Sequence, residues 1–394
     1  MSDFIVPLFG VNMSPEAPDA VGKVLLSGQI AEGPRVVDFE RKIAYHFGLA
    51  HRHLDVVTVN SGTTAIEIAL LLAGVGDGDE VITTPMTCTA TTTAIINRGA
   101  RPVWADVDPN TGNIAVQDAL ARMTEKTKAI VVVEWAGRRC DIAELRVGLE
   151  RAQHTRRLPV IEDAAHAFLM PKTDLADFRC FSFQAIKHLT TGDGGAVVMH
   201  RDHGPRARRL RWFGLDRSLP REQRFAAPQS EVGFKWHMND IAATIGLANI
   251  DGALRAVNQC RQNAQFYADV IGPHAGSAGR PAPVCLPPPD PTSAWWLYTV
   301  RVADRARFQT FMHRRGIETS EVHRRNDRID IFASIAGATA LGELEALDQF
   351  AAEQVSIPVG WWLTPAQRNA VANAVIDYSN QHRKRDPIEL PPGM

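Results

Sequence analysis

The residue with the most evident chemical potential is Lys187, which follows a short apolar and aromatic segment, residues 181–186, and precedes a glycine-rich turn, residues 192–195. A lysine shielded by apolar neighbours at the end of a strand has a lowered pKa, and its neutral amine can form a Schiff base with an aldehyde. An ordinary loop lysine is the alternative, and Lys187 on its own favours it. Two upstream segments favour the covalent role.

The first of these segments ends at Asp163, after an apolar run at residues 158–162 that is typical of a buried parallel strand. A carboxylate delivered at the carboxyl end of such a strand can face a ligand. It can pair with the protonated ring nitrogen of pyridoxal 5'-phosphate (PLP), an aldehyde cofactor whose ring then withdraws electrons. A helix-capping or solvated aspartate explains Asp163 about equally well.

The second segment is a junction between a strand pattern at residues 56–60 and a strong helix pattern, formed by Ser61, Gly62, Thr63 and Thr64. The unpaired N–H groups at the start of a helix attract an anion, and the helix dipole and the hydroxyl groups add to this attraction. Ser and Thr also cap many helices that bind nothing. Ser182, close to the lysine, can add a hydroxyl group to the same phosphate site or be a solvated strand residue.

The order of phosphate site, ring carboxylate and lysine resembles the fold-type I PLP enzymes and, within them, the sugar aminotransferases of the DegT/DnrJ/EryC1/StrS family. Further similar segments, at residues 27–40, 99–108, 238–246 and 296–298, extend the resemblance over nearly the whole chain. The resemblance implies an α/β fold in which a large domain has a mainly parallel seven-stranded sheet between helices. A smaller C-terminal α/β domain would follow it.

The resemblance also implies a role for each matching residue. Lys187 would hold PLP, be displaced by the amino donor, and carry a proton between the α-carbon of the donor and the C4′ carbon of the cofactor, with pyridoxamine 5'-phosphate as the intermediate form. Asp163 would keep the ring nitrogen protonated. His166 would lie near the phenolic oxygen, although a core histidine is an equally good interpretation. The phosphate would be bound by Gly62, Thr63 and Ser182.

Two positions depart from the family pattern. Many members have a large aromatic residue that stacks on the cofactor ring where this chain has Cys88, which can contact the ring or be only a packed thiol. Many members also have Asn where this chain has Lys235, and that Asn reaches the phosphate in the neighbouring subunit. Lysine can supply the same contact as a point charge, which predicts a homodimer with the active site at its interface. A surface lysine beside a core Trp236 is the alternative.

Residues 321–328 concentrate charge in the C-terminal part of the chain, and such a run is usually a solvated face. The substrate implied by the resemblance is a nucleotide-linked keto-sugar with a diphosphate, and arginine matches phosphate oxygens well. The candidate substrate-binding residues are therefore His323, Arg324 and Arg325. The arginine-rich stretch at residues 206–224 has few interleaved aromatic residues, which favours an exposed helix over a nucleic-acid site.

The composition is typical of a soluble enzyme. The chain has 394 residues, 45% of them hydrophobic, which suffices for a large domain and a smaller one. Its 43 Lys and Arg residues nearly balance its 44 Asp and Glu residues, so its overall charge does not attract nucleic acid or anionic membranes. The five cysteines have no metal-ligand or redox spacing. Without a signal-peptide pattern or a membrane-length apolar run, we expect a cytoplasmic protein.

Strand and helix patterns alternate along the first half of the chain, which predicts a mainly parallel sheet with helices on both faces. The expected strands are residues 56–60, 80–84, 102–106, 129–135, 159–162, 180–183 and 195–200. Ligands gather at the carboxyl ends of strands in such sheets, so one cofactor can meet the phosphate site, Asp163 and Lys187. We predict a large domain at residues 1–250 and a smaller one at residues 251–394, with a Gly/Pro-rich linker at residues 272–291.

Together these expectations describe a PLP-dependent aminotransferase that moves an amino group, from L-glutamate by resemblance, to a keto carbon of a nucleotide-linked deoxysugar. Three alternatives remain open. A sugar dehydratase on the same fold has histidine in place of the lysine, and another fold-type I enzyme such as a lyase would not share the C-terminal half. A PLP-binding regulator would hold the cofactor without turnover.

Overall fold

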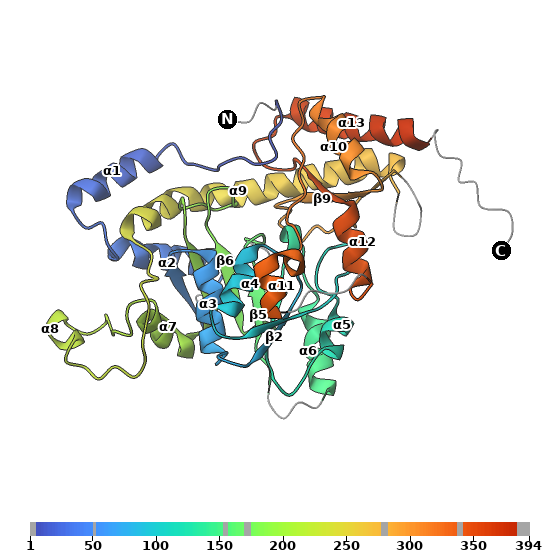
Figure 1. The fold of residues 1–394 in the computed structure, drawn as a ribbon. Helices are drawn as coiled ribbons and strands as arrows, with labels where there is room; N and C mark the ends of the chain where they lie inside the picture. The colour runs from blue at the N-terminus through green and yellow to red at the C-terminus, as the bar shows by residue number, and fades with distance from the viewer. Residues whose placement is uncertain are drawn as a thin grey trace.

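The computed structural model describes residues 5–49, 53–152, 157–168, 175–276, 283–336 and 342–383, and a seven-stranded sheet lies at its centre (Figure 1). The strands are β1 (Leu54–Val59), β2 (Glu80–Thr83), β3 (Arg101–Trp104), β4 (Thr127–Val133), β5 (Val160–Asp163), β6 (Phe178–Ser182) and β7 (Gly195–His200). Their order is β1-β7-β6-β5-β4-β2-β3. Strands β2 to β6 pair in parallel, and β7 runs antiparallel to both β1 and β6. The mainly parallel sheet predicted from the sequence is thereby confirmed.

Helices cover both faces of this sheet because alternate side chains of its strands point in opposite directions. Val57 of β1 packs in a core with α3 (Gly62–Leu72) and α4 (Thr89–Ile96). Val56, one residue earlier, packs in a second core with α2 (Pro34–His46) and the long α9 (Asp240–Ile271). The other helices of this part of the chain are α1 (Ala17–Ser27), α5 (Val116–Ala121), α6 (Ile142–Arg151), α7 (Gly204–Leu210) and α8 (Arg221–Arg224). The sheet therefore lies between helical layers.

The C-terminal part of the chain forms a separate small sheet, ordered β10-β9-β8, with its own apolar core. Its strands are β8 (Val284–Cys285), β9 (Tyr298–Val302) and β10 (Gln354–Ile357), and its helices are α10 (Arg305–His313), α11 (Asp330–Ala336), α12 (Glu345–Glu353) and α13 (Pro365–Arg383). In Figure 1, α9 runs from the end marked by α1 and α2 across the molecule to α10 and α13. The predicted boundary at residue 250 lies inside this helix, so the division at that point stays a prediction.

The segment predicted as a linker, residues 272–291, is only partly a linker. It contains a short 3-10 helix, Gly272–His274, and β8, whose Val284 is fully buried and pairs with Val302 of β9. The expectation of a plain linker was wrong here because two residues are enough to form the third strand of the small sheet. So short a strand leaves no periodic pattern in a stretch rich in glycine and proline.

The N-terminal segment crosses to the C-terminal part of the molecule. Val6 forms a β-bridge with Ile317, and the backbone N–H of Leu8 donates to Glu318 Oε2 at 2.8 Å. Phe9, the next residue, stacks on Trp296 with ring centres 5.4 Å apart. Residues 6–9 thus contact the C-terminal part both near residue 317 and at Trp296, which precedes β9.

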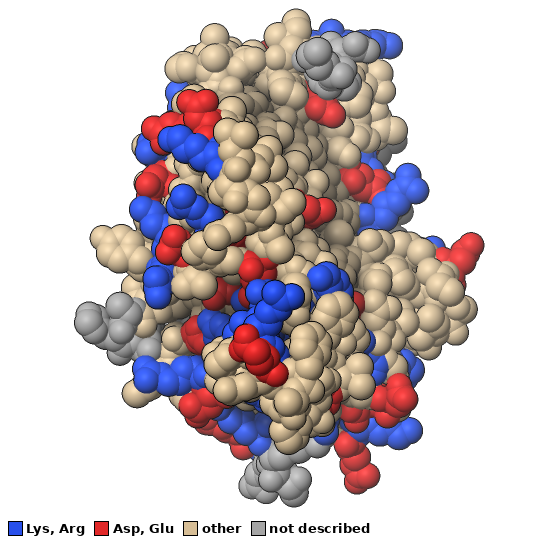
Figure 2. Space-filling view, turned by 90° about the vertical axis from the view of Figure 1, so that its left-hand side faces the viewer, with Lys and Arg blue, Asp and Glu red and all other residues tan. Residues whose placement is uncertain are grey.

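Basic and acidic side chains are intermixed on the side of the molecule shown in Figure 2. The ion pairs of the stretch 206–224 are Arg206 with Glu231, Arg208 with Asp55 and Glu40, Arg211 with Glu32 and Glu40, and Arg217 with Glu32. Arg211 is only 4% exposed, so part of this stretch is buried rather than on an exposed helix as predicted. Within the described ranges, the structure contains no helix that is both long and apolar enough to cross a membrane.

Candidate active site

A cavity of about 260 Å³ lies where β5 and β6 end and α3 begins, and it brings most of the predicted residues together. Small-molecule sites typically start at about 300 Å³, so the cavity suits a compact ligand. Eight predicted residues line it: Gly62, Thr63, Cys88, Asp163, His166, Ser182, Lys187 and His323. They come from both halves of the chain, and the fold places them around one space.

Lys187 lies in the tight connection between β6 and β7. Its N–H donates to the carbonyl of Gln184 at 2.9 Å, and the N–H of Thr191 donates to the carbonyl of Phe183 at 2.9 Å, which closes the connection. Burial lowers the pKa of the Lys187 amine to about 7, although Cys88 and Asp163 favour its charged form. A large fraction of this amine is therefore neutral near neutral pH, as bonding to an aldehyde requires.

Asp163 is the last residue of β5, and its carboxylate is 5% exposed. Its Oδ2 accepts a hydrogen bond from Thr91 Oγ1 at 2.7 Å, and its Oδ1 accepts one from the N–H of Ala165 at 3.2 Å. Burial raises the pKa of Asp163, while these two hydrogen bonds oppose the rise. A cationic N–H group entering the cavity would compensate for the lost hydration and favour the carboxylate, as the nitrogen of a protonated pyridine ring does.

The first turn of α3 forms the anion end of the cavity. Ser61 caps this helix by accepting a hydrogen bond from the N–H of Thr64 at 3.1 Å, while Gly62 and Thr63 face the cavity at the positive end of the helix dipole. A Cβ atom added to Gly62 would lie only 2.7 Å from Cβ of Ser182 at the end of β6. Glycine at this position therefore lets the helix start and the serine hydroxyl share one site.

The close approach of Gly62 and Ser182 leads to a stability prediction. Gly62→Ala should lower the free energy of unfolding by about 1–3 kcal/mol, because the added methyl group forces the helix and the strand end apart. Thermal denaturation of the cofactor-free protein measures this. The matched control is Gly76→Ala, since a Cβ at Gly76 would have nothing within 4 Å. Equal melting temperatures for the two variants would contradict the close packing at Gly62.

Two neutral histidines and a tryptophan form one wall of the cavity. The His166 ring stacks on Trp296 with centres 4.0 Å apart and on His323 with centres 5.6 Å apart. Burial lowers the pKa of His166 well below its ordinary value and that of His323 to about 4, so both imidazoles are neutral near neutral pH. Among the described residues, His166 Nδ1 and His323 Nε2 are buried without a hydrogen-bond partner. Both nitrogens are therefore available to a ligand.

The remaining candidates lie around or outside this cavity. Cys88, at the start of α4, lines it, whereas Lys235 is exposed and its Nζ lies 4.0 Å from the ring centre of Trp212. Arg324 is exposed beside His323. Arg325 forms ion pairs with two aspartates, Asp327 at 2.6 Å and Asp348. Binding a diphosphate through Arg325 would require these pairs to break, so this candidate has the weakest structural support of the three.

Sequence reasoning missed two residues that contact the predicted ones. Thr91 supports Asp163, and Thr91 Oγ1 also lies 2.8 Å from Thr87 Oγ1. Thr87 precedes α4 and Thr91 lies in its first turn, so no helical spacing in the sequence indicated this contact. The other missed residue is Trp296, which contacts both Lys187 and His166. Its sequence position gives no signal of this, because the contact depends on how the C-terminal part packs on the large sheet.

Comparison with known proteins agrees with this geometry. Residues 12–376 match the model of the DegT/DnrJ/EryC1/StrS aminotransferase family, and the chain belongs to this family. The UDP-4-amino-4-deoxy-L-arabinose–oxoglutarate aminotransferase of Shewanella sediminis (strain HAW-EB3) is 34% identical over 316 residues, which are 77% of each chain. The predicted class of enzyme, an aminotransferase, is thus confirmed.

Solved structures of similar chains share the whole architecture. The sugar aminotransferase CalS13 from Micromonospora echinospora is 35% identical, with a TM-score of 0.85 over 95% of this chain and 100% of that chain. AtS13 from Actinomadura melliaura is 37% identical, with a TM-score of 0.86 over 96% of this chain and 100% of that chain. The predicted fold class is therefore confirmed at both levels, for the large sheet and for the C-terminal part.

Proposed function

We propose that this aminotransferase uses PLP and moves an amino group from an amino acid to a keto carbon of a nucleotide-linked deoxysugar. The observation that carries the proposal is the convergence of three groups on one cavity: the amine of Lys187, the carboxylate of Asp163 and the first turn of α3. These groups match the aldehyde, the ring nitrogen and the phosphate of a single cofactor. The residues present therefore fit PLP.

The residues divide the chemical work according to their environments. When bound, PLP supplies an electron-withdrawing ring that stabilises negative charge on the carbon next to the amino group. Asp163, oriented by Thr91, keeps the ring nitrogen protonated and so preserves this property. Lys187 would hold the aldehyde end, and its neutral amine, when free, would accept and return a proton. Its pKa of about 7 suits both directions of transfer.

The other lining residues position the cofactor. Gly62 and Thr63 hold its phosphate through backbone N–H groups, and Ser182 adds a hydroxyl group. The unpartnered Nδ1 of His166 is suited to the phenolic oxygen. Cys88 lines the same cavity, so the cofactor ring would meet a thiol there.

The identity of the substrates is supported by the relatives and by the rim of the cavity. The name of the Shewanella sediminis relative includes a UDP-linked amino sugar and oxoglutarate, the keto acid that L-glutamate becomes when it donates its amino group. His323 lines the cavity, and Arg324 is exposed next to it. We propose that these two side chains contact the sugar nucleotide, with Arg324 near its diphosphate.

Incubation of the holoenzyme with a panel of nucleotide-linked keto-sugars and L-glutamate tests the proposal. We expect one panel member to gain an amino group, seen by mass spectrometry, with an equal amount of 2-oxoglutarate. A dehydratase would give a product without added nitrogen, and a regulator would give no product; either result contradicts the proposal.

We also propose that the exposed Lys235 reaches the active site of a neighbouring subunit. The same preparation should then sediment as a dimer, and a monomer with full activity would refute that role.

A further inference from the structure

Trp296 contacts Lys187 and its surroundings in three ways. The Nζ atom of Lys187 lies 3.4 Å from the centre of the Trp296 ring. The indole Nε1–H donates to the carbonyl of Ile186, the residue before the lysine, at 2.9 Å. The ring of His166 stacks on the indole at 4.0 Å with 22° between the planes. Trp296 therefore contacts the Lys187 amine, the backbone next to the lysine and the His166 ring at the same time.

The indole is held firmly in this place. Trp296 precedes β9, is 4% exposed, and packs in an apolar cluster with Trp135 and Leu297. Phe9 of the N-terminal segment also stacks on it, with ring centres 5.4 Å apart. The C-terminal part and the N-terminal segment together therefore present a fixed aromatic face to an amine on the large sheet.

We propose that Trp296 is a positioning residue for Lys187: its indole face holds the lysine amine in the cavity whenever that amine is not bonded to an aldehyde. The face of an indole ring carries negative charge density, so it attracts an ammonium group. The proposal rests on the catalytic role proposed for Lys187. It adds a residue that fixes the position of the free amine and influences how readily that amine loses its proton.

Several other titratable groups face the Lys187 amine and act on its charge. They are Asp163 at the end of β5, Cys88 before α4, His166 after β5, His188 next to the lysine, and His323 in the C-terminal part. The carboxylate and the thiol favour the ammonium form, whereas burial opposes it most strongly. All these groups remain when Trp296 is replaced. A change in the pKa of the amine between variants therefore reports the loss of the indole face.

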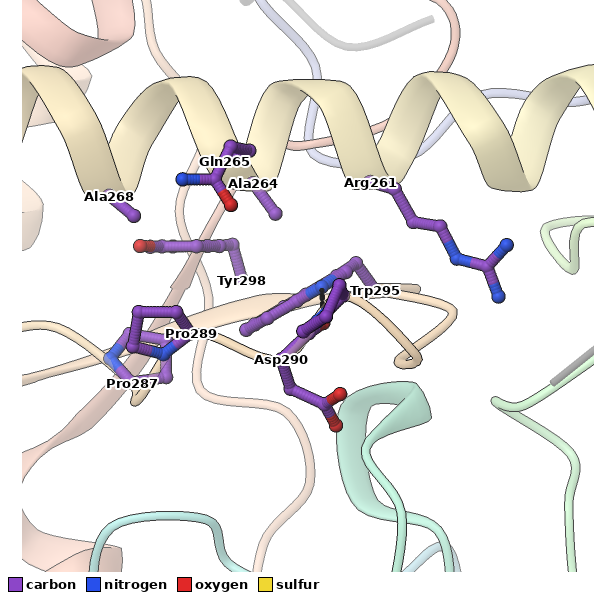
Figure 3. Close-up of a pocket in the computed structure, with 10 residues that line it drawn as sticks. Arg261, Ala264, Gln265, Ala268, Pro287, Pro289, Asp290, Trp295 and Tyr298 are labelled. Carbon is purple, nitrogen blue, oxygen red and sulfur yellow. Dashed lines mark hydrogen bonds between the residues drawn. The ribbon is translucent and has the colours of Figure 1, made fainter. Parts of the chain in front are cut away.

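The neighbouring Trp295 is a matched control. It is also 4% exposed, but it packs against Tyr298 with ring centres 5.3 Å apart. Figure 3 shows Trp295 beside a second, small pocket under α9, where its Nε1–H donates to the carbonyl of Asp290 at 2.9 Å. Replacing Trp295 removes an equally buried indole without removing the face on which Lys187 rests.

The test measures the pKa of the Lys187 amine in the cofactor-free, full-length protein. A brief pulse of an acylating reagent labels only neutral amines, and peptide mass spectrometry gives the labelled fraction of Lys187 at each pH. The wild-type profile should have its midpoint near pH 7. Trp296→Leu should move the midpoint down by about one unit, because the ammonium loses its aromatic partner while burial still disfavours it.

Two further variants complete the test. Trp296→Phe keeps an aromatic face but loses the hydrogen bond to Ile186, so its midpoint should fall by less than that of Trp296→Leu, and Trp295→Phe should match the wild type. An unchanged or raised midpoint in the folded Trp296 variants overturns the proposal. Should Trp296→Leu not fold, the midpoint of Trp296→Phe alone provides the test. Because the labelling needs neither cofactor nor substrate, its outcome is independent of whether the keto-sugar assay succeeds.

Discussion

Replacing Lys187 with alanine should abolish amino transfer, with a loss of turnover of at least about 10⁴-fold, because one amine both bonds the cofactor and moves the proton. Among the described residues that line the cavity, Lys187 supplies the one amine. The variant should still fold, since the side chain that is removed lies in a loop and faces a cavity. The measurement is the rate of 2-oxoglutarate formation from L-glutamate in the presence of an accepted keto-sugar.

A chemical trap identifies the bonded lysine independently of turnover. Wild-type protein incubated with PLP should be yellow, and borohydride should fix the cofactor on the peptide that contains Lys187. The control Lys126→Ala removes an exposed lysine before β4 and should trap the cofactor like the wild type. Colour and a fixed adduct on a different lysine, or full turnover in Lys187→Ala, would contradict the assignment.

The large sheet was predictable because its strands are short apolar runs that end in polar or turn-forming residues. Strands buried on both faces need such runs. Accordingly, β5 (Val160–Asp163) and β7 (Gly195–His200) lie within one residue of their predicted positions. The strand predicted at residues 129–135 was placed two residues too late, since β4 spans Thr127–Val133. The apolar run continues into Trp135, which is fully buried in a short 3-10 helix, and burial alone does not separate a strand end from a buried turn.

The candidate site was predictable only where its residues follow the strands. Asp163 ends β5 and Lys187 follows β6, and neighbouring parallel strands bring their carboxyl ends together. The resemblance implied that Gly62 and Ser182 share one phosphate site. How closely they approach could not be predicted, because it depends on the distance between a helix start and a strand far along the chain. The same is true of Trp296, which reaches Lys187 from the C-terminal part.

The charged segment at residues 321–328 shows a further limit of sequence patterns. Arginine and aspartate stand side by side in it, and the pattern does not tell which charges neutralise one another. In the structure, Asp327 is fully buried and pairs with Arg325, while Arg324 is exposed. Only the three-dimensional arrangement separates the arginine that stabilises the fold from the one that is free to meet a ligand.

Asp163→Asn should lower turnover between about 10²-fold and a few thousandfold, because removing one partner of a buried ion pair costs about 3–5 kcal/mol and each 1.36 kcal/mol is tenfold. The asparagine side chain has the same shape and can still accept the hydrogen bond from Thr91. It lacks the charge that keeps a ring nitrogen protonated. The half-reaction of the PLP form with L-glutamate, followed by the absorbance of the cofactor, measures the effect.

The same variant separates a functional carboxylate from a structural one. In the cofactor-free protein, burial raises the pKa of Asp163, so its ionisation above that pKa opposes folding, and this cost is present at neutral pH. A neutral asparagine at this position would not carry that cost, and we expect Asp163→Asn without cofactor to be at least as stable at neutral pH as the wild type by thermal denaturation. With PLP bound, the wild type should be the more stable of the two proteins, because only the carboxylate gains a cationic partner. Wild-type turnover in Asp163→Asn, or lower stability without cofactor, would show that the charge of Asp163 supports the fold and not the cofactor.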